Sequence, residues 1–116
     1  MKSIFDNVSF DCSVKVTKAY STSFSSAVKM LAPSISQDIY NIYGFVRFAD
    51  EIVDTFHDYD KEALFSQFEN ELSLALSQKI SLNPILNSFQ HTVNKYNIPM
   101  ELIDAFMNSM KLDLHT

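Results

Sequence analysis

The sequence predicts an all-helical fold, and three of its features lead to this prediction. One Gly and three Pro in 116 residues leave little material for the tight turns of a β-protein. Apolar residues recur at helical spacing, as in Leu64, Phe65, Phe68, Leu72 and Leu76. Hydrophobic residues make up 47% of the chain, which is enough to form the core of one small domain.

A proline separates the first two predicted helices. The first spans about residues 14–31, and it ends there because the residue before Pro33 disfavours helical geometry. The second would be capped by Ser34 or Ser36 and would extend to about His57. These two segments contain most of the residues to which a function can be assigned.

Three further helices are predicted after a short polar turn. Asp60 can cap the third helix, which extends to about Ser77. The fourth begins near Pro84, because a proline in the first turn lacks only an N–H that the helix does not use, and it ends near residues 96–97. Pro99 opens the fifth. The sequence therefore predicts about five helices.

Composition limits the compartment and the class of partner. The single Cys12 excludes an internal disulfide and suits a reducing cytoplasm. Residues 1–6 lack the apolar core of a signal peptide, and no apolar run approaches membrane-spanning length. A net charge of −5 argues against a nucleic-acid partner. We therefore expect a cytoplasmic protein that does not bind nucleic acid.

The helical pattern continues almost to the last residue, Thr116, with no sign of a cap or a tail. We therefore expect residues 1–116 to be the N-terminal part of a single, longer helical domain. Such a piece would expose apolar faces of its second and third helices. Self-association is the expected consequence.

One narrow stripe of polar residues interrupts the second predicted helix. With Tyr43 at 0°, a helix places Arg47 near 40°, Asp50 near −20° and Asp54 near 20°. The rest of the helix is apolar, so we expect the stripe to face the protein interior. Two carboxylates one turn apart repel each other, and Arg47 can compensate only one of them. The remaining negative charge predicts a bound metal ion, although an ordinary solvated helix face is the alternative.

The histidines and the cysteine are weaker candidates. His57, His91 and His115 lie on three different predicted segments without ligand spacing, so we interpret them as surface or packing residues. Cys12 precedes the first predicted helix and has no visible base, so we do not expect a catalytic thiol.

Residues 42–54, with the sequence IYGFVRFADEIVD, resemble the first aspartate-rich motif of the phytoene/squalene synthase family. Residues 20–25 resemble the S-x-S-F segment of the family's first helix, and residues 110–114 resemble its M-x-x-D-L stretch. Because the order and spacing of all three agree, the resemblance covers essentially the whole chain. It is strongest toward phytoene synthase.

The resemblance implies an isoprenoid-synthase-like fold with helices around a deep apolar pocket. It implies that two prenyl diphosphates, in the first place geranylgeranyl diphosphate, are joined head to head to give phytoene. Asp50 and Asp54 would hold Mg²⁺ with Glu51 as outer support, and Arg47 would contact diphosphate oxygens. The residues that it implies for substrate binding are Tyr43, Ser21, Ser23, Phe24 and Asp113.

Other functions stay open at this point. Squalene synthase-type activity on farnesyl diphosphate is the nearest alternative, and a non-catalytic helical module whose acidic stripe meets a basic partner is a second. A di-iron bundle would need Glu-x-x-His pairs, which do not occur. The family's second D-x-x-x-D is also absent, so we expect this piece to be inactive alone. A lipid product would favour peripheral contact with a membrane.

Overall fold

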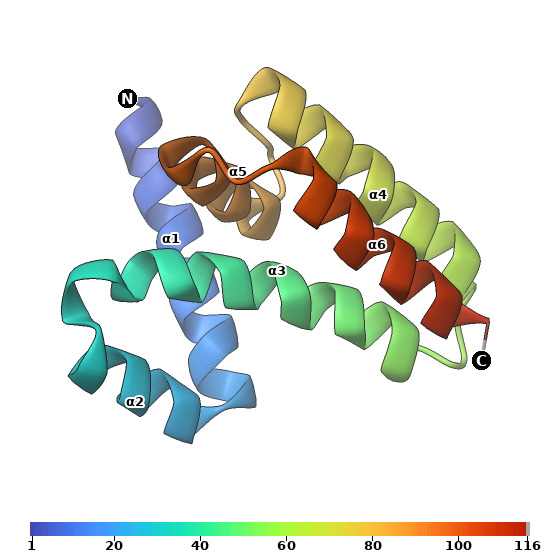
Figure 1. Cartoon of the computed structure of the whole chain (residues 1–116), viewed down its shortest axis with the longest axis horizontal. Helices are drawn as coiled ribbons and strands as arrows, with labels where there is room; N and C mark the ends of the chain where they lie inside the picture. Colours follow the sequence, from blue (N-terminus) through green and yellow to red (C-terminus); the bar gives the residue numbers. More distant parts are fainter. Residues whose placement is uncertain (116) are drawn as a thin grey trace.

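Helices make up the architecture of residues 1–115, the part of the chain that this computed structural model describes (Figure 1). The end of the predicted domain, Thr116, lies outside the described residues. The elements in order are α1 (Lys2–Tyr20), α2 (Thr22–Leu31), the 3₁₀-helix η1 (Pro33–Ile35), α3 (Ser36–Asp54), α4 (Lys61–Gln78), α5 (Pro84–Tyr96) and α6 (Met100–Leu114). The all-helical prediction is confirmed, with six α-helices in this range rather than five.

The prediction of one first helix over residues 14–31 is wrong, because two helices meet at Ser21. Ser21 has a non-helical φ of −153°, and its Oγ accepts a hydrogen bond from the backbone N–H of Phe24 at 3.2 Å. This contact caps α2 and separates it from α1. Cys12 therefore lies within a helix, not before the first one.

The predicted limits of the second helix also need correction. Neither Ser34 nor Ser36 caps α3: Ser34 lies in η1, and Ser36 is the first residue of α3, whose cap position is Ile35. The helix ends at Asp54 rather than His57. Lys61 Nζ donates a hydrogen bond to the carbonyl oxygen of Val53 at 2.5 Å. A cation that binds an orphan carbonyl is a favourable helix end.

The beginnings of the last three helices agree with the prediction. Asp60 Oδ1 accepts a hydrogen bond from the N–H of Ala63 at 3.1 Å and caps α4. Asn83 caps α5 ahead of Pro84, and Pro99 occupies the cap position of α6. At these three positions the capping residue and its immediate neighbours were enough to predict where the helix begins.

α3 is the central helix and packs against α1, α4, α5 and α6 (Figure 1). The core forms around Phe45, whose ring stacks on Phe89 at a centroid distance of 3.9 Å and on Phe68 at 5.7 Å. Phe106 from α6 completes this aromatic group at 5.5 Å. One aromatic side chain therefore joins four helices.

The interface of α1 with α3 and α5 is polar rather than apolar. Ser9, Ser13 and Thr17 form the buried face of α1. Asn87 of α5 donates to Ser9 Oγ at 3.1 Å and to Asp6 Oδ1 at 2.9 Å. Small side chains allow the helices to approach closely. Hydrogen bonds satisfy the hydroxyl groups of Ser9 and Thr17. The buried Oγ of Ser13 has no hydrogen-bond partner among residues 1–115. The hydrophobic pattern on which helix prediction depends is therefore missing from the first half of α1.

Within the described residues, none of the helices combines the length and the apolar character needed to cross a bilayer.

Candidate active site

The predicted stripe on α3 lies at an open side of the bundle. Tyr43, Arg47 and Asp50 are half-buried and Asp54 is exposed. The expectation that the stripe faces the protein interior is therefore wrong in the part of the chain that the structure describes. The reason is that the opposite side of α3 supplies the core, including Phe45 and other apolar residues. Here the stripe borders a groove rather than a closed interior.

Arg47 binds a different carboxylate from the one expected. Its Nη2 lies 2.6 Å from Oε1 of Glu51, one turn further along α3, and both side chains are largely buried. Tyr20 covers the guanidinium, with a distance of 4.8 Å from Arg47 Cζ to the ring centroid. Arg47 Nε is shielded from solvent and has no hydrogen-bond partner among the described residues. Neither Asp50 nor Asp54 forms an ion pair with Arg47 in this part of the chain.

Asp50 lies in a field of negative charge. Its burial raises the pKa of its carboxyl group, and the charges of Asp54, Glu51 and Asp113 raise it further, while Arg47 opposes this change. Asp113 belongs to α6, so carboxylates of two helices act on one another here. Like charges that cannot be fully hydrated favour protonation or a bound cation.

The carboxylates fit Mg²⁺ in their chemistry. Mg²⁺ takes oxygen ligands and commonly uses only one or two protein carboxylates, with water and phosphate oxygens in the other positions. Asp50 and Asp54 provide such a pair, one turn apart on α3. Within residues 1–115, no three His, Cys, Asp or Glu side chains gather closely enough to hold an ion by themselves. A metal at this site would therefore need ligands from elsewhere.

An apolar hollow lies in the groove between α3 and α6, which run side by side in the same direction (Figure 1). Its volume is about 200 Å³, and its lining residues are Ile42, Phe45, Val46, Phe89, Ile98, Leu102, Ile103 and Phe106. Helical spacing places Val46 one turn before Asp50 on α3. On α6, Leu102, Phe106 and Asp113 share one face by the same spacing. The groove is therefore apolar at one end and acidic at the other.

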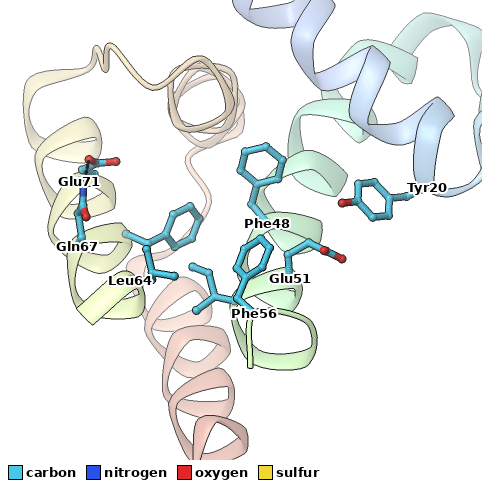
Figure 2. A pocket seen from close by; sticks show the side chains of 9 residues that line it. Tyr20, Phe48, Glu51, Phe56, Leu64, Gln67 and Glu71 are labelled. Carbon is cyan, nitrogen blue, oxygen red and sulfur yellow. Dashed lines mark hydrogen bonds between the residues drawn. The ribbon is translucent and has the colours of Figure 1, made fainter. Parts of the chain in front are cut away.

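A second, larger hollow lies between α3 and α4 (Figure 2). Its volume is about 400 Å³, and its walls are mainly the apolar side chains Phe48, Ile52, Phe56, Leu64 and Phe68. Glu51 and Tyr20 lie at one side of it and Glu71 at the other (Figure 2). The ion pair of Arg47 therefore reaches the edge of this hollow through Glu51.

The structure brings some of the implied substrate-binding residues together. The rings of Phe24 and Tyr43 stack at a centroid distance of 5.3 Å, so α2 contacts the stripe of α3. Ser21 is used as a helix cap, and Ser23 is exposed on α2. Sequence reasoning missed Tyr20, although it directly precedes the S-x-S-F segment that drew attention to its neighbours.

The three histidines occupy different places in the described part of the chain. His57 lies beside Lys61, His91 packs against the ring of Phe10, and His115 lies 3.5 Å from Glu62. Each of the three histidines therefore has a separate structural environment.

Comparison with known proteins identifies the family. The family model described as squalene/phytoene synthase matches residues 17–116, which leaves only the first part of α1 outside the match. No curated protein and no solved structure matches the chain. The three segments that resemble the family lie within the matched range, at Tyr20 and Phe24, on α3, and near Asp113. The chain therefore belongs to the squalene/phytoene synthase family.

Proposed function

We propose that this chain binds prenyl diphosphate in the groove between α3 and α6 for Mg²⁺-assisted, head-to-head condensation. The squalene/phytoene synthase family consists of prenyltransferases that join two prenyl diphosphates head to head. The observation that best supports the proposal is the polarity of the groove. Carboxylates of both helices lie at one end and an apolar hollow at the other. A prenyl diphosphate has the same division between a charged head and an apolar tail.

The charged side chains of α3 would each have a separate role in binding the metal and the diphosphate. Asp50 and Asp54 would hold Mg²⁺, which neutralises the diphosphate when bound and makes it a better leaving group. Glu51 supports this arrangement indirectly, because it binds Arg47 at 2.6 Å. Arg47 keeps other N–H groups that can bind phosphate oxygens.

Aromatic side chains would protect the reaction from water. Loss of diphosphate leaves an allylic carbocation, which an aromatic face stabilises. The stacked pair Phe24 and Tyr43 lies beside the stripe and offers such faces. Ser21 and Ser23 at the start of α2 would supply hydroxyl donors, and Asp113 would contribute to the acidic end from α6.

For the substrate, we propose geranylgeranyl diphosphate and the product phytoene, because the segment YGFVRFADEIVD is closest to phytoene synthase. The alternative is farnesyl diphosphate and squalene. The chain contains only the first of the family's two aspartate motifs, so we propose that these residues bind substrate but do not turn it over alone. We also propose a cytoplasmic location, with peripheral contact to the membrane that receives the lipid product.

Binding of a non-hydrolysable thiodiphosphate analogue tests the proposal directly. Calorimetric titration with geranylgeranyl thiodiphosphate should show binding in Mg²⁺ and a large loss of affinity in EDTA. The farnesyl analogue in the same assay compares the two substrates: equal or tighter binding of this shorter tail would contradict the assignment of phytoene as the product. Asp50→Asn and Asp54→Asn should each weaken the Mg²⁺-dependent part of binding.

The competing function is a non-catalytic module whose acidic stripe binds a basic partner. The exposed position of Asp54 is the observation that favours it. In that case a basic peptide would bind without Mg²⁺, and the thiodiphosphate would not bind at all. The same titrations therefore separate the two functions.

A further inference from the structure

Tyr20, Arg47 and Glu51 form a contact group that links the end of α1 to α3. The guanidinium lies between the Tyr20 ring, 4.8 Å away, and the Glu51 carboxylate, 2.6 Å away. Figure 2 shows the hydroxyl end of Tyr20 directed towards Glu51. Partial burial raises the pKa of Tyr20, and the negative charge of Glu51 raises it further, which agrees with this proximity. The three side chains therefore restrain one another.

We propose that Tyr20 is a positioning residue: its ring holds the Arg47 guanidinium in place to receive diphosphate oxygens. The inference depends on the proposed function for its ligand, but the restraint on Arg47 can be measured without one. Glu51 alone fixes one end of the fork through a single Nη2 contact. The ring of Tyr20 adds a planar surface that limits rotation of the whole group.

The restraint reduces the conformational entropy that the Arg47 side chain loses when diphosphate binds. A free arginine side chain has many rotamers, and a ligand that binds it must immobilise it. In this chain that loss occurs during folding, because α1 brings Tyr20 over the guanidinium. Arg47 Nε is buried without a hydrogen-bond partner among residues 1–115, which agrees with a guanidinium that is held by packing against Tyr20.

The first experiment measures the restraint itself. Arg47 is the only arginine in the sequence, so its Nε–Hε group gives a single NMR signal. Its ¹H–¹⁵N heteronuclear NOE reports motion on the picosecond-to-nanosecond timescale. We expect an ordered signal in the wild type and in Tyr20→Phe, which keeps the ring, and a mobile signal in Tyr20→Leu. Tyr59→Leu is the matched control, because Tyr59 is 71% exposed and lies in the turn after α3.

The second experiment measures the consequence for the ligand, with inorganic pyrophosphate and Mg²⁺ as the probe. Tyr20→Leu should weaken binding about fivefold, which corresponds to about 1 kcal/mol. In an Arg47→Gln background, Tyr20→Leu should change the affinity no further, because the residue on which it acts is gone. Tyr20→Phe should restore most of the affinity.

The results distinguish the inference from the proposed function. An Arg47 signal that stays ordered in Tyr20→Leu would overturn the inference, and so would an equal loss of affinity from Tyr20→Leu in both backgrounds. Wild-type protein with an ordered Arg47 that fails to bind pyrophosphate in Mg²⁺ would instead overturn the proposed function.

Discussion

The hydroxyl of Thr92 on α5 donates a hydrogen bond to the buried carboxylate of Asp38 on α3, at 3.0 Å. Lys95 and Tyr96 donate to the other carboxylate oxygen, each at 2.8 Å. Burial alone would raise the pKa of Asp38, but these three hydrogen bonds outweigh it and lower the pKa below its ordinary value of 3.8. The acid therefore connects α3 to α5 mainly in its ionised form.

Asp38→Asn should destabilise the fold by about 1–3 kcal/mol at neutral pH, because an amide N–H would face two donors. The stabilisation from a lowered pKa is complete above 3.8 and decreases as the pH falls below that value. The stability difference between wild type and variant should therefore shrink in acid. Urea unfolding at several pH values measures it. Asp11→Asn, at an exposed position on α1, should show neither effect.

Gly44→Ala should stabilise the protein, although Gly44 lies where α3 meets α1 and α5. A Cβ at this position would be 3.5 Å from Ser13 Oγ and 3.6 Å from Ile85 Cδ1, which is ordinary van der Waals contact. Alanine is a better helix former than glycine by about 0.5–1 kcal/mol. The melting temperature should rise for Gly44→Ala and fall for Gly44→Leu, whose longer side chain has no room. A lower melting temperature for alanine would contradict this.

Phe45→Ala should cost about 3–5 kcal/mol, because it removes the side chain that joins four helices and leaves a cavity. The matched control is Leu82→Ala, at a position that is 88% exposed. We expect the control to stay within about 0.5 kcal/mol of the wild type. Denaturant titration of both variants compares them, and equal stability losses would show that Phe45 is not the centre of the core.

Asp50→Asn and Asp54→Asn should abolish Mg²⁺-dependent turnover in any form of the enzyme that is active, and should leave the fold intact. An amide keeps the shape of the acid but loses the charge that binds Mg²⁺. The free energy of unfolding should rise slightly, by about 0.2–0.5 kcal/mol, because repulsion between carboxylates one helical turn apart is relieved. Asp60→Asn is the control, since asparagine caps a helix as well as aspartate does. Near-normal turnover in both stripe variants would contradict the catalytic assignment.

Self-association is expected at high protein concentration. Leu102 is 63% exposed and lines the apolar end of the groove between α3 and α6. A second copy could cover this surface and remove it from water. Light scattering should show a mass that rises with concentration, and Leu102→Gln should reduce this rise. Leu74→Gln, at another exposed leucine, should have a smaller effect. A monomer throughout the range would contradict the prediction.

The sequence by itself determined the fold class and the beginnings of the last three helices. Asp60, Asn83 with Pro84, and Pro99 act through their own backbone geometry and that of the next few residues, so their effect can be recognised locally. The D-x-x-x-D pattern also depends only on helical spacing. It identified the stripe of α3 and, with the flanking motifs, the family to which the chain belongs.

Tertiary structure alone decided how these elements and side chains are used. The sequence did not predict the first half of α1, because the buried face of this helix consists of Ser9, Ser13 and Thr17 rather than apolar residues. Small polar residues become buried only where another helix packs closely against them and supplies hydrogen bonds, as α5 does for Ser9. Helical spacing allows Arg47 to reach either Asp50 or Glu51. The structure selects Glu51, because the end of α1 places Tyr20 over the guanidinium on that side of α3. Contacts between residues far apart in sequence arise from packing, and no local pattern specifies them.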